Sequence, residues 1–133
     1  MRNYNNDFLY QFIKTYDVVN EDVCKSCIKT INKNKDWIQH TFYNESLKKS
    51  HTRSGSKELS VLHYDQASGD EKKIIILGSL NNNYEGGEFI MFDKKEYKIK
   101  AGQVLIFPSF FFFPHRVEPV TKGTRYTYIS WAY

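Results

Sequence analysis

The stretch QVLIFPSFFFFPHRVEPVTKGTRYTYISWAY, residues 103–133, contains segments rich in β-branched and aromatic residues with turn residues between them. Such segments favour strands, and we expect strands over 103–107, 115–120 and 124–133. The same criteria, applied toward the N-terminus, predict further strands over 58–64, 73–80, 87–92 and 96–100. About seven or eight short strands at this spacing are typical of a β-sandwich or a small barrel.

One helix is clear in the N-terminal part of the sequence. Asn20 is a typical N-cap, and Glu21 and Asp22 place negative charge in the first turn, where the helix dipole favours it. Apolar residues then recur at helical spacing as far as Ile31. We therefore predict a helix over 20–31.

The rest of the N-terminal part is polar and mixed. Residues 8–19 fit a strand, which we favour, or a second helix, and 47–56 are typical of a loop. We expect a single domain over 1–133, in which 1–56 provide helical and loop support and 57–133 form the β core.

Length, composition and charge narrow the class of protein. At 133 residues the chain suits one hydrophobic core and is too short for two domains. It lacks an apolar run of about eighteen residues and a basic-then-apolar start, so we expect a soluble cytoplasmic protein that does not enter a membrane. The net charge of +4 permits an acidic partner, but the lysines are scattered, and a solvated face is preferred to nucleic-acid binding.

Cys24 and Cys27 form a C-x-x-C pair inside the predicted helix. A redox pair would place its first thiol at the helix N-terminus, and a zinc site would need a second Cys or His pair that the sequence lacks. We therefore interpret both cysteines as small, half-buried helix residues.

Two histidines and one aspartate have the composition of a non-haem Fe(II) site. His63 and Asp65 are two residues apart on an expected strand, so their side chains share one face and can bind one metal. His115 supplies the third ligand. A buried aspartate beside a histidine needs compensating charge, which a metal provides directly.

The sequence after His115 indicates how Arg125 could be placed to bind an anionic co-substrate. We interpret 121–123 as a three-residue hairpin loop with Gly123 in the left-handed position, which would pair Val117 with Thr127 and His115 with Ile129. Opposed residues share a face. The residues expected on one face are His115, Val117, Arg125 and Thr127.

In that register Arg125 lies four residues from His115, about 13 Å at roughly 3.3 Å per residue. An arginine side chain and a five-carbon diacid together span about this gap, so the diacid could bind iron at one end and the guanidinium at the other. The alternative for Arg125 is a salt bridge, for example with Glu118.

Several motifs then resemble one family. They are His63-Tyr64-Asp65, Leu77-Gly78-Ser79-Leu80-Asn81, Tyr84-Glu85-Gly86-Gly87-Glu88-Phe89, Ile106-Phe107-Pro108-Ser109, Pro114-His115-Arg116-Val117-Glu118-Pro119-Val120 and Gly123-Thr124-Arg125-Tyr126 with Trp131. Together they resemble the Fe(II)/2-oxoglutarate-dependent dioxygenases. Within these they are most similar to the prolyl-hydroxylase-like branch, especially the small versions encoded by bacteria and their phages.

The resemblance implies a double-stranded β-helix, or jelly roll, with one or two N-terminal helices. It implies that His63, Asp65 and His115 hold Fe(II) as the catalytic centre and that Arg125 anchors 2-oxoglutarate, with O2 as the second co-substrate. It leaves an ascorbate requirement and the oligomeric state open. The residues that it places around the co-substrate are Leu77, Ser79, Val117, Thr127 and Trp131. For Leu77 and Val117 an ordinary core position is an equal alternative.

The resemblance also implies the reaction, in which oxidative decarboxylation of 2-oxoglutarate is coupled to hydroxylation of a C–H bond. Asp65 favours hydroxylation, because relatives that halogenate lack this carboxylate. A prolyl or other residue of a peptide or protein is the expected substrate. Relatives that act on nucleic-acid bases carry a second arginine where this chain has Trp131, so the sequence argues against that branch.

Two alternatives follow, one from differences between this sequence and the family pattern and one from the phenylalanine run over 110–113. The segment before His63 looks shortened, and Arg53 stands where relatives place a co-substrate-contacting tyrosine. A catalytically impaired metal-binding or interaction module is therefore the alternative function. The run 110–113 could plug the end of the barrel, which we favour, or present aromatic rings to a peptide.

Overall fold

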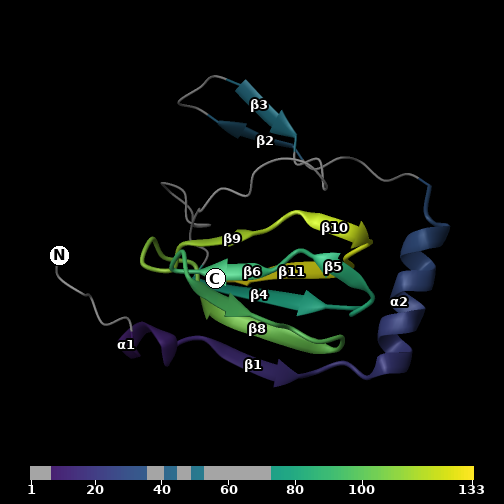
Figure 1. The fold of residues 1–133 in the computed structure, drawn as a ribbon, viewed down its shortest axis with the longest axis horizontal. Helices are drawn as coiled ribbons and strands as arrows, with labels where there is room; N and C mark the ends of the chain where they lie inside the picture. The colour runs from purple at the N-terminus through teal and green to yellow at the C-terminus, as the bar shows by residue number, and fades with distance from the viewer. Residues whose placement is uncertain (1–6, 36–40, 45–48, 53–72) are drawn as a thin grey trace.

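The computed structural model describes residues 7–35, 41–44, 49–52 and 73–133. Figure 1 shows a layered β structure with the short helix α1 near one end and the longer helix α2 across the other. In chain order the elements are α1 Asp7–Tyr10, β1 Lys14–Asp17, α2 Glu21–Lys33, β2 Thr41–Asn44, β3 Lys49–Thr52, β4 Ile74–Ser79, β5 Tyr84–Gly86, β6 Phe89–Met91, β7 Lys95–Tyr97, β8 Gln103–Pro108, β9 His115–Val117, β10 Val120–Gly123 and β11 Thr127–Ala132.

The strands form antiparallel sheets that lie on either side of the core. The main sheet has the order β1-β8-β4-β11, and the smaller sheets are β7-β6-β9 and β10-β5. The chain passes from β8 to the smaller sheets for β9 and β10 and returns to the main sheet for β11. The mainly β, double-stranded β-helix fold with two N-terminal helices is therefore confirmed.

The core lies between the main sheet and the β7-β6-β9 sheet. Leu105 and Phe107 of β8 and Phe89 and Met91 of β6 are each less than 5% exposed. The rings of Phe89 and Phe107 meet with centroids 5.6 Å apart, which joins the two sheets directly. Residues at alternate positions of each strand supply this core, as expected for strands with one buried face.

Helix α2 confirms the predicted helix and its cap. The Asn20 side chain accepts a hydrogen bond from Val23 N at 2.9 Å, and Glu21 and Asp22 occupy the first turn. Cys24 is 1% exposed and Cys27 is exposed, and both thiols are free. The half-buried interpretation is therefore wrong for both cysteines, because Cys24 is buried and Cys27 is exposed.

Two N-terminal predictions change in detail. Residues 8–19 contain both alternatives, because α1 ends at Tyr10 and β1 then pairs with β8 at the edge of the main sheet. The loop predicted for 47–56 is wrong at 49–52, which form β3 and pair with β2. The predicted strand over 58–64 lies outside the described residues.

The predicted hairpin around 121–123 is wrong. Residues 120–123 are themselves β10, which pairs with β5, while Thr127 pairs with Ser79 and Val117 with Phe89. Gly123 does adopt the left-handed backbone, with φ of 76°. It does so where the chain passes from β10 in one sheet to β11 in the main sheet. The turn at Gly123 was therefore predicted correctly, but the strands on its two sides do not pair with each other.

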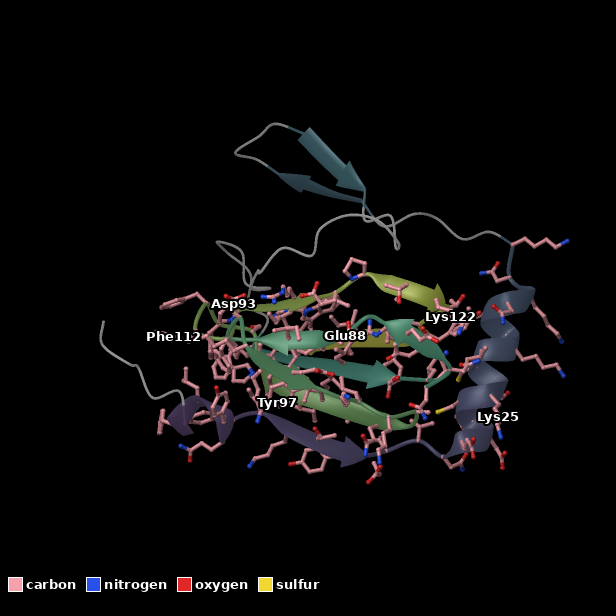
Figure 2. All side chains as sticks on the ribbon, viewed as in Figure 1. Lys25, Glu88, Asp93, Tyr97, Phe112 and Lys122 are labelled. Carbon is pink, nitrogen blue, oxygen red and sulfur yellow. The ribbon has the colours of Figure 1, made fainter. Side chains whose placement is uncertain are left out.

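The aromatic run 110–113 divides into two parts. Phe113 is 5% exposed and belongs to the core, whereas the other three phenylalanines are at least 41% exposed. Figure 2 shows Phe112 at the end of the barrel that lies opposite α2. The plug interpretation therefore applies to Phe113 alone.

This division predicts unequal costs for identical substitutions. Phe113→Ala should lower the free energy of unfolding by about 3–5 kcal/mol, because it leaves a cavity among packed rings. Phe112→Ala, at an exposed position, should cost less than about 1 kcal/mol. Urea denaturation of both variants checks this, and equal losses would show that the run acts as one packed unit.

Candidate active site

His115 is the predicted ligand that the structure describes most fully. It begins β9, is 4% exposed, and points between the sheets. Its ring stacks on Phe89 with centroids 5.3 Å apart and meets the edge of Phe107 at 5.1 Å. The two phenylalanines come from opposite sheets, so the imidazole is held from both sides.

The ring nitrogen Nδ1 of His115 lies 3.1 Å from the carbonyl oxygen of Phe113. A carbonyl can only accept a hydrogen bond, so Nδ1 carries the proton, and in the neutral ring Nε2 carries the lone pair. Histidines that bind metals are commonly oriented by such a bond from their other nitrogen. The described geometry of His115 therefore fits an Fe(II) ligand.

The β6–β9 ladder positions the other half of the site. Its register pairs Met91 with His115 and Phe89 with Val117. Backbone hydrogen bonds continue it, with Glu118 N donating to Glu88 O at 2.9 Å and Gly87 N donating to Pro119 O at 3.0 Å. Alternation along these strands gives His115, Val117, Phe89 and Met91 the inner face.

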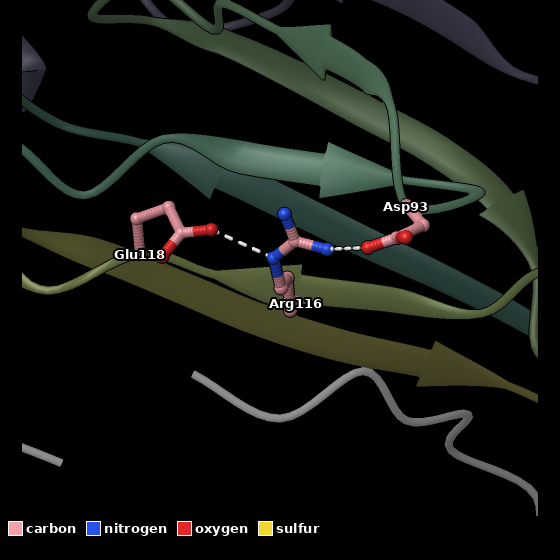
Figure 3. A network of polar contacts seen from close by, with 3 residues as sticks. All are labelled: Asp93, Arg116 and Glu118. Atoms are coloured by element: carbon pink, nitrogen blue, oxygen red, sulfur yellow. Dashed lines mark hydrogen bonds and ion pairs between the residues drawn. The ribbon is translucent and has the colours of Figure 1, made fainter. Parts of the chain in front are cut away.

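The outer face of this ladder carries a separate ion-pair network. Figure 3 shows Arg116 between Glu118, whose carboxylate lies 2.7 Å from Nε, and Asp93. These carboxylates, Glu118 first, raise the pKa of Arg116. The alternative salt bridge between Arg125 and Glu118 is therefore wrong, because Glu118 pairs with Arg116.

Arg125 reaches the interior beside Gly87. A Cβ on Gly87 would lie only 2.9 Å from Cδ of Arg125, so the arginine stem passes directly over this glycine. Nε of Arg125 is fully buried, and none of the described residues accepts a hydrogen bond from it. A buried guanidinium nitrogen with no acceptor is costly, so this atom fits a site for an anion.

The separation between the two side chains follows from the ladder. Gly87, beneath Arg125, is four residues from Met91, which pairs with His115. At roughly 3.3 Å per residue this is about 13 Å. The predicted hairpin around 121–123, which implied the same distance, is wrong. The register of the β6–β9 ladder gives a similar distance between the two side chains.

The remaining predicted pocket residues lie on three strands. Leu77 and Ser79 are buried on β4, and β11 pairs Thr127 with Ser79 and Trp131 with Ile75. Thr127 and Trp131 are half-buried and share one face of β11, and Trp131 packs against the core. Leu77 belongs to the hydrophobic core, and Val117 packs against the same core.

The hydroxyl of Ser79 donates to the carbonyl of Asn81 at 3.1 Å, so a local contact already occupies it. His63 and Asp65, and Arg53 with the apparently shortened segment around it, lie outside the described residues. Within the described parts, the predicted site residues thus lie on β4, on β9, on β11 and in the segment 124–126 that carries Arg125.

Two residues near the site were not predicted. Gly87 was predicted only as the first residue of a strand, although a glycine pair at the start of a strand can mark a close approach of another side chain. Asn81 is 7% exposed and contacts the backbone on both sides of Arg125. A polar residue directly after an apolar strand was its only local signal.

Comparison with known proteins supplies the family. The model of the 2OG-Fe(II) oxygenase superfamily matches residues 49–133. The chain belongs to this superfamily. Fe(II), 2-oxoglutarate and O2 are accordingly its cofactor and co-substrates.

Its relatives include several PKHD-type hydroxylases. One from Gloeothece citriformis is 48% identical over 52 residues, which cover 37% of this chain and 23% of the relative. One from Aliarcobacter butzleri is 45% identical over 51 residues, covering 36% and 22%. The matched part therefore spans about a quarter of the length of these relatives.

Solved structures of viral collagen prolyl hydroxylase from Paramecium bursaria Chlorella virus-1 share the fold. A truncated form has a TM-score of 0.64 at 18% identity and covers 90% of this chain and 89% of its own. The complex with 2-oxoglutarate has a TM-score of 0.64 at 17% identity and covers 90% and 94%. Among the described residues of this chain, no helix is long and apolar enough to cross a membrane.

The hydrogen bond to Phe113 predicts the tautomer of His115. In the metal-free protein near neutral pH, a long-range ¹H–¹⁵N spectrum should show His115 with a protonated Nδ1 and an unprotonated Nε2. His115→Ala assigns the signals. Finding the proton on Nε2 instead would contradict the orientation described above.

Proposed function

We propose that this chain is an Fe(II)- and 2-oxoglutarate-dependent hydroxylase that acts on a residue of a peptide or protein, a prolyl residue first among them. His63, Asp65 and His115 would hold the iron, and Arg125 would bind the far carboxylate of 2-oxoglutarate. The observation that carries this proposal is the placement of buried His115 relative to the half-buried Arg125. His115 and the stem of Arg125 lie beside one ladder, about 13 Å apart, and Nε of Arg125 has no acceptor among the described residues.

Each residue has a distinct task in this proposal. Bound iron would supply the oxidising chemistry that couples decarboxylation of 2-oxoglutarate to hydroxylation of a C–H bond. The Phe113 carbonyl orients His115, and Phe89 and Phe107 keep water from its ring. The planar guanidinium of Arg125 matches the geometry of a carboxylate, which it can bind through two parallel hydrogen bonds.

The relatives support a peptide substrate. The related bacterial proteins are named as PKHD-type hydroxylases, and the structural neighbour acts on collagen prolines, as its name states. The four-phenylalanine run ends two residues before His115 and exposes three rings there. We propose that a peptide approaches from the side of these three exposed rings.

Cytoplasmic localisation and the single-domain organisation over 1–133 stay predictions, and a role for ascorbate stays open.

The proposal predicts cooperative loading of iron and 2-oxoglutarate. Anaerobic addition of both to the apoprotein should produce a saturable visible charge-transfer band, because the keto acid chelates the metal. His115→Ala should abolish the band. Arg125→Ala should weaken 2-oxoglutarate binding by roughly a hundredfold, since it removes a charge-assisted contact worth about 1.5–3 kcal/mol.

Circular dichroism of each variant is the control for folding. A folded, iron-loaded protein that shows no band at any 2-oxoglutarate concentration would contradict the proposal. The impaired binding module would then be the better description of the chain.

Gly87 provides a test that leaves every ligand residue unchanged. Gly87→Ala would place a methyl group 2.9 Å from Cδ of Arg125, in a backbone with φ of 69°. We expect the arginine to be displaced, the affinity for 2-oxoglutarate to fall roughly tenfold, and stability to fall by about 1–2 kcal/mol. Fe(II) affinity, measured in the same variant, should not change. Unaltered 2-oxoglutarate affinity would separate Gly87 from the function of Arg125.

A further inference from the structure

Arg125 lies in a short segment between two strands. Residues 124–126 follow β10, which ends at Gly123, and precede β11, which begins at Thr127. Their backbone belongs to neither strand, so the position of Arg125 depends on other contacts. The hydrogen bonds that hold both neighbours of Arg125 come from residues 80 and 81, which directly follow β4.

Asn81 holds this segment on both sides of Arg125. Its Nδ2 donates to the carbonyl of Thr124 at 2.8 Å, and its Oδ1 accepts from the backbone N–H of Tyr126 at 2.8 Å. The backbone N–H of Leu80 donates to the carbonyl of Tyr126 at 2.9 Å. One side chain therefore grips the residues directly before and after the arginine.

Only a side-chain amide can make both contacts in this orientation. An aspartate could accept from Tyr126 but would turn a carboxylate oxygen toward the Thr124 carbonyl. Asn83 fixes which end of the amide points where, since its Oδ1 accepts the second Nδ2 hydrogen at 2.6 Å. Asn81 is 7% exposed, so an unmade bond here would not be replaced fully by water.

A second anchor holds the far side of the segment. The hydroxyl of Tyr126 donates to Oδ1 of Asn32 near the end of α2 at 2.7 Å. That contact is exposed and touches only Tyr126. Asn81 is therefore the buried contact that ties down both neighbours of Arg125.

We propose that Asn81 is a positioning residue that sets the affinity of this enzyme for the far carboxylate of its co-substrate, through the backbone on either side of Arg125. This inference rests on the proposed function, in which Arg125 binds 2-oxoglutarate. Asn83 supports Asn81 by orienting its amide.

The experiment compares two ligands in the anaerobic, Fe(II)-loaded protein. 2-Oxoglutarate has the far carboxylate, and 2-oxobutyrate chelates metal in the same way but lacks it. Their dissociation constants, and that of Fe(II), are measured for the unaltered protein, Asn81→Ala, Arg125→Ala and the double variant. Asn82→Ala is the matched control, because the Asn82 side chain binds Ala101 N instead of this segment.

Asn81→Ala should weaken 2-oxoglutarate binding roughly tenfold, in line with the loss of buried hydrogen bonds. It should leave 2-oxobutyrate and Fe(II) binding unchanged, and it should add no further loss when Arg125 is already alanine. Asn82→Ala should match the unaltered protein. A general loss of structure would instead weaken both keto acids together.

If Asn81→Ala does not fold, Asn83→Ala gives the answer, because Asn83 is exposed and its removal leaves the other amide contacts in place. It should shift 2-oxoglutarate affinity alone, by a smaller factor. Equal weakening of both keto acids in the folded variant, or no weakening of either, overturns the inference. If the unaltered protein binds no 2-oxoglutarate, the proposed function fails. If Arg125→Ala loses affinity and Asn81→Ala does not, the inference fails by itself.

Discussion

The antiparallel ladder between residues 87–91 and 115–119 is the constraint on which the site depends. It gives His115 a place opposite Met91 at one end and brings Gly87 opposite Pro119 at the other. Since the rise per residue is nearly constant, the backbone hydrogen bonds of the ladder fix the separation between His115 and Gly87, over which the Arg125 stem passes. The ring contact between Phe89 and Phe107 then fixes this ladder against the main sheet.

Local sequence signals predicted β4, β6, β7, β8, β9 and β11, but they missed β2, β3 and β5, treated most of β10 as a loop and assigned the wrong strand partners. The left-handed glycine at position 123 serves a tight hairpin and a passage between sheets equally, and nothing within the loop distinguishes them. Pairing is decided by the whole jelly roll, in which β10 meets β5 and β11 meets β4. The spacing between His115 and Arg125 now rests on a different register, in which Gly87 beside the Arg125 stem lies four residues from Met91, and their roles in the site stay predictions.

Only those site residues could be predicted from the sequence whose side-chain types are uncommon in buried positions. Histidine, aspartate and arginine at family spacing are informative because few structural tasks need them buried. Asn81 and Gly87 act through contacts with residues 38 to 45 positions away. An asparagine after a strand or a glycine in a turn has many ordinary explanations, so these two roles become visible only with the fold.

The placement of Arg125 also bears on selectivity between keto acids. Folding has already removed its Nε from water, and the described residues give it no acceptor. A ligand with a second carboxylate can supply that acceptor, whereas one that ends in a methyl group leaves the nitrogen unsatisfied. Sites built around a buried polar group reject analogues that lack the partner much more strongly than apolar pockets reject a missing methylene. The discrimination therefore depends on how rigidly the guanidinium is held in place, and the amide of Asn81 is what holds the backbone on either side of it.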